Sequence, residues 1–363
     1  MIGRPERTMV TESDSIVAAT AARIFGDLAD PQTVNNARDE RWKEPLWRAL
    51  SDAGLSLAWV PESRGGAGAS LADGFAILGV AGRYAAPVPL AETLLAGWLL
   101  AQARLDAPDG AMTVAPARPR DHIMLNADGS LSGTAGAIPF AGDSKHVAVL
   151  ADGSAGATIA LVKTADCRVS EGRNLAGDAS NAVTFDRVKP VQSAAAPAGF
   201  DASSLMLMGA IVRSVQSAGA LETILSLSVR YANERVAFER PIGKFQAVQQ
   251  NLARLAGETA AALAAAGSAA DTIAQSGKFD DALWLEAASA KIRCGEAAAE
   301  GAAIAHQVHG ALGFTREHVL HRFTLRLLSW RDDFGSESYW AARLGSLIAQ
   351  RGSNNFWPLM ASR

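Results

Sequence analysis

The spacing of hydrophobic and polar positions changes twice along the chain. Residues 13 to about 105 carry apolar side chains three and four apart, which is the spacing of amphipathic helices. Residues 112 to about 190 alternate instead, and Gly, Asp, Asn and Ser separate the alternating runs. Helical spacing returns from residue 203 to 345. The pattern predicts an α+β fold that is mainly α.

Three domains follow from this division. We predict an N-terminal helical domain (1–108), a small middle β-barrel or sheet domain (109–197) and a C-terminal four-helix-type bundle (198–363). Short antiparallel strands are expected at 146–150, 158–162 and 182–185, and residues 190–197 are expected to form a linker. The predicted helices are 13–28, 44–53, 70–84, 90–105, 204–235, 244–267, 279–309, 317–330 and one from 338.

The stretch 231–250 concentrates the most specific information. It predicts the end of one helix, a tight turn and the start of another, because Pro241 stops a helix and Gly243 permits a turn. An arginine, a phenylalanine and several glutamines at such a corner suggest a bundle with a ligand-facing end. The alternative is that Arg235 is only the surface ion-pair partner of Glu239, four residues along the same helical face.

Composition excludes several classes of function. The 363 residues have a net charge of −3 and a pI near 6.1, which argues against nucleic-acid or anionic-membrane partners because both need a basic face. Cys167 and Cys294 lie far apart and are typical of free thiols in a reducing compartment. The N-terminus lacks the apolar core of a signal peptide, and we expect a soluble, cytoplasmic protein.

No metal site is predicted. Four of the six histidines lie in one helical region in two pairs spaced three apart, and zinc there is conceivable. Neither a cysteine nor a Glu-x-x-His pairing supports that reading. The four are His306, His309, His318 and His321.

Three motifs in this order and spacing resemble the acyl-CoA dehydrogenase family. The resemblance extends over the chain from about residue 13 to residue 350. The first is the loop Trp59-Val60-Pro61-Glu62 with Gly65-Gly66-Ala67-Gly68, similar to the family's PEeyGGxG. The second runs from Arg235 to Gln246 and is similar to RxxFGxPIGxFQ. The third runs from Gln307 to Phe314 and is similar to QvhGGxGf.

The resemblance implies an acyl-CoA dehydrogenase fold and a bound FAD at the junction of the β-domain, the bundle and a neighbouring subunit. Arg235 would meet the flavin pyrophosphate, and Phe238 and Gln246 would line the same crevice. Gln307 and Gly310 would belong to the partner-side contact. The implied partners are an acyl-CoA substrate, an electron-transfer flavoprotein or similar acceptor, and further subunits in a homo- or hetero-oligomer such as a tetramer.

The implied reaction is α,β-dehydrogenation of an acyl-CoA thioester, in which a carboxylate removes the α-proton. The family's usual glutamate falls at Phe334 here, and its second location falls near Ala210. Neither side chain can take a proton. Asp333 is the best remaining candidate for the base, and its alternative is a solvated charge paired with Arg331 or Arg326.

The middle domain departs from the family too. Its Tyr/Phe-x-x-Ser/Thr-Glu segment is not visible within 113–122, and Ala137-Ile138-Pro139 replaces its tryptophan-isoleucine-threonine strand. Such losses resemble one subunit of bacterial heteromeric acyl-CoA dehydrogenases acting on bulky esters such as steroid side-chain CoA esters. Two hypotheses result: an FAD-dependent dehydrogenase of fatty acid or steroid side-chain catabolism, and a non-catalytic partner subunit.

Overall fold

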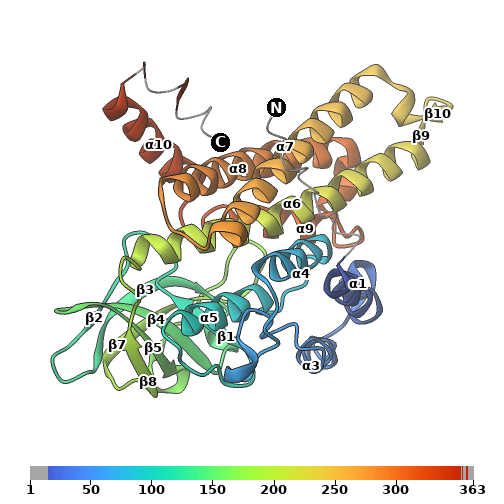
Figure 1. The fold of residues 1–363 in the computed structure, drawn as a ribbon. Helices are drawn as coiled ribbons and strands as arrows, with labels where there is room; N and C mark the ends of the chain where they lie inside the picture. Colours follow the sequence, from blue (N-terminus) through green and yellow to red (C-terminus); the bar gives the residue numbers. More distant parts are fainter. Residues whose placement is uncertain (1–14, 353, 355–356, 359–363) are drawn as a thin grey trace.

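The computed structural model describes residues 15–352, 354 and 357–358 (Figure 1). Helices form the first part of this range, and polar side chains cap the N-termini of three of them, α1, α2 and α4. Ser15 caps α1 and Ser70 caps α4, each by accepting a hydrogen bond from a backbone N–H of the first turn. The helices are α1 (Ile16–Leu28), α2 (Pro31–Asn36), α3 (Lys43–Asp52), α4 (Leu71–Tyr84) and α5 (Leu90–Gln102).

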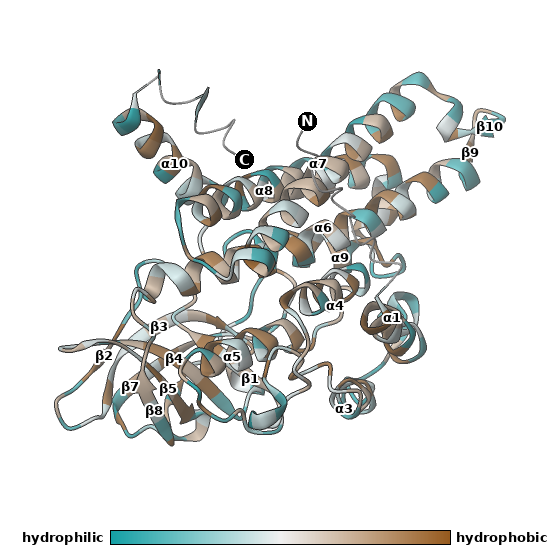
Figure 2. Ribbon diagram, viewed as in Figure 1, coloured by the Kyte–Doolittle hydropathy of each residue, from teal (hydrophilic) through white to brown (hydrophobic). Residues whose placement is uncertain are grey.

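One mixed sheet forms the middle part, in the order β6-β7-β3-β2-β4-β5-β8, with β1 also paired to β4. The strands are β1 (Met112–Ala115), β2 (His122–Leu125), β3 (Leu131–Pro139), β4 (His146–Gly153), β5 (Gly156–Lys163), β6 (Arg168–Val169), β7 (Ser180–Val188) and β8 (Gln192–Ala195). Short 3-10 turns follow β3 and β5: η3 (Ala141–Asp143) and η4 (Thr164–Asp166). α5 packs against this sheet, and hydrophobic residues concentrate where they meet (Figure 2).

Two sheet predictions were wrong. The strands are not all antiparallel, since both β1 and β2 pair with β4 in parallel. Residues 190–197 are not a linker either, because β8 pairs antiparallel with β5, with Thr158 opposite Ala195. β8 is an edge strand whose residues alternate between half-buried and exposed, so it lacks the apolar pattern of an inner strand.

Long helices form the C-terminal bundle. They are α6 (Ala202–Glu234), α7 (Gln246–Ser276), α8 (Asp281–His309), α9 (Leu320–Trp330) and α10 (Glu337–Arg351). α6, α7 and α8 pack against one another, and α4 packs against α6. Alanine and glycine at the contacts allow close approach: a Cβ at Gly219 of α6 would lie 2.2 Å from the carbonyl oxygen of Gly79 on α4.

α6 is the only helix in the described part of the chain that is long and apolar enough to cross a membrane. The most apolar window of α6 is 94% buried inside the protein, so the composition reflects a core helix. The paired helices α6 and α7 extend past their neighbours at one end, and α10 projects at the other (Figure 1). The three domain boundaries stay a prediction, although helix gives way to strand between α5 and β1 and strand to helix between β8 and α6.

Candidate functional site

The corner between α6 and α7 is a small β-hairpin. α6 ends at Glu234, and β9 (Val236–Ala237) pairs antiparallel with β10 (Arg240–Pro241). Phe238 and Glu239 form the two-residue turn, with φ angles of 53° and 65°. Two consecutive positive φ values define the turn type that matches the twist of a hairpin. Glu239 therefore occupies a left-handed position that favours the glycine of the family motif.

The hairpin contradicts the expectation that Arg235 and Glu239 lie on one helical face. Arg235 lies after the last residue of α6, so Arg235 and Glu239 do not share a helical face. No ion pair joins Arg235 to any carboxylate within the described residues, and its side chain is exposed. Its backbone is held on both sides, since its N–H donates to Tyr231 and its carbonyl accepts from Ile242 at 2.8 Å each. Its backbone is therefore fixed, and its guanidinium has no ion-pair partner among the described residues.

A groove of about 320 Å³ lies between the hairpin, α7 and the end of α8, and its lining begins at Ala237, two residues after Arg235. Phe238 and Gln307 both line it, although they are 69 positions apart in sequence. Phe238 is 89% exposed, and its ring meets that of Phe245 edge-on at 6.1 Å. A large apolar ring this exposed is typical of a surface that is covered by a ligand or by another subunit.

Of the remaining residues expected to bind the cofactor, Gln246 and Gly310 lie within two positions of groove residues in the sequence but do not line the groove themselves. Gln246 is the exposed first residue of α7, and the Gln307 side-chain oxygen accepts a weak hydrogen bond from Asn251 at 3.4 Å. Gly310 ends α8 with φ 59°, and a Cβ there would meet nothing within 4 Å. An unpaired arginine, amide side chains and an open glycine fit the phosphate end of a dinucleotide. Their roles in binding stay a prediction.

The two locations for the catalytic base lie against each other and are both apolar. Phe334 is 2% exposed, and its ring packs on α6 at Gly209, where a Cβ would lie 2.2 Å from the ring. Its backbone N–H donates to Ala117 just after β1, and its carbonyl accepts from the Trp340 indole, both at 3.0 Å. Ala210 is fully buried beside it. A phenyl ring therefore fills the position that the family resemblance gives to a carboxylate.

Asp333 belongs to a buried group of charges. Arg213 of α6 donates to Asp333 at 2.9 Å and to Glu92 of α5 at 2.5 Å. Lys291 of α8 donates to the carbonyl oxygens of Trp330 and Arg331 at 2.7 and 2.9 Å. These carbonyls lie at the end of α9, just before Asp333. Two anions and two cations balance, so the cluster has no net charge. It pins the segment that carries Phe334 to three helices.

The expected partners of Asp333 were wrong. Arg331 pairs with Glu337, and Arg326 pairs with Asp178, so neither neutralises Asp333. Burial raises the pKa of Asp333, while Arg213 and Lys291 act in the opposite direction. A raised pKa suits a general base, but a hydrogen bond from a guanidinium holds one carboxylate oxygen. The assignment of Asp333 as the base stays a prediction.

Sequence reasoning missed Arg213, Glu92 and Lys291. The available signal was a single charge inside each of two otherwise apolar or Ala-rich segments, around Glu92 and Arg213, whereas Lys291 lies close to Arg293 and Glu296 and gave no such signal. A charge on a buried helix face needs a partner. Which charges meet depends on the packing of α5, α6 and α8, and so it could not be read from the chain.

The four histidines near the end of α8 pack as a cluster rather than as metal ligands. The His309 ring stacks on Tyr231 at 4.5 Å and lies 4.7 Å from the His318 ring. No group of three or more metal-ligating side chains occurs among residues 15–352 as described. Burial lowers the pKa of all four imidazoles, and that of His318 falls to about 4. They are neutral at neutral pH.

This cluster makes stability fall in acid. A histidine whose pKa is lower in the folded chain binds fewer protons there than when unfolded, so unfolding takes up protons between the two values. For His318 that window runs from 6.5 down to about 4. We expect the urea midpoint to drop between pH 7 and pH 5, and to drop less in His318→Gln.

The matched control is His122→Gln, whose side chain is 67% exposed on the β-domain. It should keep the wild-type slope. A midpoint that is constant or rises as the pH falls from 7 to 5 would contradict the role given to the cluster.

Comparison with known proteins decides the family. Residues 199–337 match the family model described as acyl-CoA dehydrogenase, C-terminal domain. Acyl-CoA dehydrogenase IpdE2 of Mycobacterium tuberculosis is 30% identical over 320 residues, which is 87% of this chain and 91% of that protein. The chain belongs to the acyl-CoA dehydrogenase family. FadE27 of the same organism, also named an acyl-CoA dehydrogenase, is 28% identical over 342 residues, 86% of this chain and 90% of the relative.

Solved structures confirm the acyl-CoA dehydrogenase fold. The ChsE4–ChsE5 complex from Mycobacterium tuberculosis contains a chain with a TM-score of 0.80 at 24% identity, covering 92% of this chain and 96% of that one. A chain of a Tcur3481–Tcur3483 steroid ACAD variant has a TM-score of 0.78 at 27% identity, covering 92% and 97%. The α+β, mainly α fold class and the family resemblance are both confirmed.

Membership makes the chain an acyl-CoA dehydrogenase homologue and supports an oxidoreductase acting on acyl-CoA thioesters. Family members are typically flavoproteins, and the neighbouring structures include FAD complexes. The family motif also explains the corner: a glycine belongs where Glu239 now has a positive φ. The chain carries the arginine, phenylalanine and glutamines of the family motifs, and it has a phenylalanine at position 334, where the resemblance implies a carboxylate.

Proposed function

We propose that this chain is a cytoplasmic subunit of an FAD-dependent enzyme that dehydrogenates an acyl-CoA thioester between its α and β carbons. The observation that supports it best is the corner between α6 and α7. There the exposed Arg235 has no carboxylate partner among the described residues, and the hairpin that follows it lines a groove together with Gln307. A pyrophosphate would supply the missing negative charge.

Each residue of the corner has a defined part in this proposal. Arg235 would neutralise the pyrophosphate and orient it through two parallel N–H donors. Gln246 and Gln307 would offer amide donors, and Gly310 would admit backbone at close range. Phe238 would cover apolar surface that is otherwise exposed. When bound, FAD supplies the two-electron acceptor for the β-hydrogen.

The reaction also needs a carboxylate that removes the α-proton, from this chain or from a second subunit. An α-proton of a thioester is weakly acidic, so a carboxylate must stand close to it. In this chain Phe334 and Ala210 occupy both family locations. The carboxylate is then Asp333, whose pKa burial raises, or it comes from a second, related subunit. An electron-transfer flavoprotein or a similar acceptor would take the electrons.

A second candidate is a non-catalytic partner subunit of a heteromeric acyl-CoA dehydrogenase. The buried ring of Phe334 on Gly209 favours it, because it leaves no room for a carboxylate there. Two of the similar structures carry names of two-chain complexes, ChsE4–ChsE5 and Tcur3481–Tcur3483, and the second is named a steroid ACAD. A steroid side-chain ester is accordingly the first substrate to try, and a fatty acyl ester the second.

The visible spectrum of the purified chain separates the two candidates. A yellow protein whose flavin absorbance bleaches on adding an acyl-CoA thioester supports the catalytic subunit. A colourless chain that gains flavin only with a second polypeptide supports the partner role. A chain that binds no flavin in either preparation would reject both.

Asp333→Asn tests the base. Flavin reduction by an acyl-CoA should be abolished if this carboxylate removes the proton, whereas unchanged reduction would reject the assignment. Asp332→Asn is the matched control, since Asp332 is adjacent and exposed. Because Asp333 also pairs with Arg213, the urea midpoint of the variant must be measured beside its activity.

A further inference from the structure

A second pocket lies on the β-domain, where β4 begins and β5 ends. Its volume is about 690 Å³, and residues of η3, β4, β5 and η4 line it. Met112 at the start of β1 pairs in parallel with His146 at the start of β4. The far end of β1 leads to Ala117, which accepts the hydrogen bond from Phe334. The pocket is therefore at the opposite end of β1 from the buried Phe334.

Backbone hydrogen bonds fix the walls of this pocket. Lys145 donates its N–H to the carbonyl of Ala111 and accepts from the N–H of Thr164, both at 3.0 Å. Ser144 closes the turn of η3 by donating to Ala141 at 3.3 Å. Three segments that are distant in sequence are thus held together, so the backbone around the opening is fixed.

Three residues that line this pocket each have a buried polar side-chain atom without a hydrogen-bond partner. The atoms are the hydroxyl of Ser144, the hydroxyl of Thr164 and the Nδ1 of His146. Ser144 is 5% exposed, so water reaches its hydroxyl poorly. Nine such buried atoms occur in the described part of the chain, and three of them belong to residues of this pocket. Three others belong to Arg293, Arg331 and Glu337, whose side chains are already in ion pairs. Buried polar groups normally have partners, so the concentration of such atoms at this pocket indicates a missing one.

Two cations stand at the same opening. Lys145 and Lys163 both line the pocket, and no ion pair within the described residues neutralises either ammonium. Burial and then the two lysines lower the pKa of His146, so its ring is neutral and free to donate or accept. Burial raises the pKa of Cys167 to about 11, which keeps its thiol uncharged. The lining therefore has a net positive charge.

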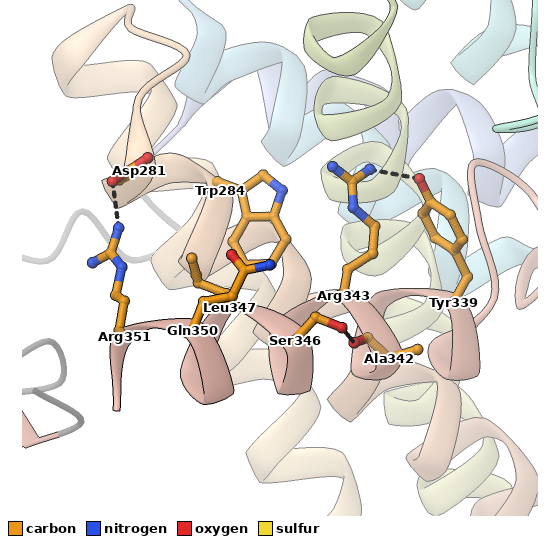
Figure 3. Close-up of a pocket in the computed structure, with 9 residues that line it drawn as sticks. All are labelled: Asp281, Trp284, Tyr339, Ala342, Arg343, Ser346, Leu347, Gln350 and Arg351. Atoms are coloured by element: carbon orange, nitrogen blue, oxygen red, sulfur yellow. Dashed lines mark hydrogen bonds and ion pairs between the residues drawn. The ribbon is translucent and has the colours of Figure 1, made fainter. Parts of the chain in front are cut away.

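Another surface groove does not combine unpaired cations with polar atoms that lack a hydrogen-bond partner. It lies between the start of α8 and α10 and has a volume of about 530 Å³ (Figure 3). Arg343 there donates to the Tyr339 hydroxyl at 2.6 Å and stacks over Trp284, and Arg351 pairs with Asp281. Its cations already have partners.

We propose that the pocket bordered by Ser144, Lys145, His146, Lys163 and Thr164 binds a phosphate group. The two ammonium groups would supply the charge, and the two hydroxyls and the imidazole would supply directed hydrogen bonds to phosphate oxygens. The phosphate is either the free anion or the terminal group of a phosphate monoester. Binding here is independent of the flavin corner and of the reaction.

Calorimetric titration of the full chain with inorganic phosphate, in chloride buffer at pH 7.5, tests the proposal. We expect saturable binding that weakens about tenfold or more in Lys145→Gln/Lys163→Gln, because two charge-assisted hydrogen bonds are lost. Ser144→Ala should weaken binding severalfold while leaving the charge unchanged. Lys278→Gln, which removes an exposed lysine from the loop before α8, should bind like wild type.

A parallel titration with adenosine 5′-phosphate, against adenosine, identifies the source. Tighter binding of the monoester or of the free anion supports the site in either case, provided that the double lysine variant loses it. The proposal is overturned if wild type shows no saturation by about 10 mM phosphate. It is equally overturned if the double variant, with an unchanged melting temperature, binds as wild type does.

Discussion

Arg213→Met is expected to destabilise the folded chain by about 3–5 kcal/mol, because it leaves two carboxylates buried without their cation. Arg213 is 3% exposed, and Glu92 is 5% exposed. Breaking a buried ion pair costs more than the pair itself contributes, since the remaining charges cannot return to water. Among the residues that the structure describes, Lys291 is the other cation that acts on Asp333, and two backbone carbonyls already hold its ammonium.

Urea denaturation gives the free energy of unfolding for this test. The control is Arg48→Met, which removes an exposed arginine paired with Glu44 and should cost less than about 1 kcal/mol. Adding Glu92→Gln to Arg213→Met should recover part of the loss, because one of the stranded charges is then gone. A loss below about 1 kcal/mol for Arg213→Met would show that the cluster is hydrated and not buried.

Phe334→Ala is expected to cost about 3–5 kcal/mol, the usual range for removing a fully buried aromatic ring. Gly209→Ala alone should also destabilise, because its new methyl group would sit 2.2–2.6 Å from ring atoms of Phe334. In the double variant the methyl group enters the space that the ring has left. The two changes should therefore be strongly non-additive, with Gly209→Ala harmless in the Phe334→Ala background.

A double-mutant cycle in urea measures this coupling. Additive effects of the two substitutions would mean that the ring does not occupy the space against α6. The family location of the base would then be open, and the argument that a phenyl ring replaces a carboxylate would lose its structural ground.

The sequence predicted the larger elements because their patterns are local. The period of apolar residues placed α4, α5 and the bundle helices within a few residues of their ends, and the alternation placed β4, β5 and β7. α7 was predicted to stop near Gly267 and instead continues to Ser276. An exposed glycine costs a helix only about 1 kcal/mol, and burial of Ala269, Ala270 and Ile273 outweighs it.

What the sequence could not predict depends on contacts between distant segments. β8 has a polar edge pattern, and only its pairing with β5 makes it a strand. The parallel pairing of β1 with β4 also needs the whole sheet. Asp333 adjoins Phe334 in the sequence, but its ion-pair partner Arg213 comes from 120 positions earlier in the chain. The local pattern of apolar and polar residues predicts the helix or strand on which a residue lies. It does not predict which residues from distant segments that residue contacts.

At the corner around Arg235, the sequence motifs predicted neighbours that the spacing of apolar residues could not predict. Periodicity carried the helix through Arg235, whereas the structure ends α6 at Glu234 and builds a hairpin. The motif nevertheless brought Phe238 and Gln307 to one groove. Short motifs retain tertiary information that amphipathic period does not contain.

Flavin bound per chain in Arg235→Leu, purified together with any subunit that accompanies the wild type, tests the central claim most directly. A charge-assisted bidentate contact contributes about 1.5–3 kcal/mol, so the variant should bind FAD about ten- to a hundredfold more weakly and lose most of its yellow colour on gel filtration. Arg48→Leu should keep the wild-type flavin content. If Arg235→Leu retains as much flavin as the wild type, the corner between α6 and α7 does not hold the cofactor.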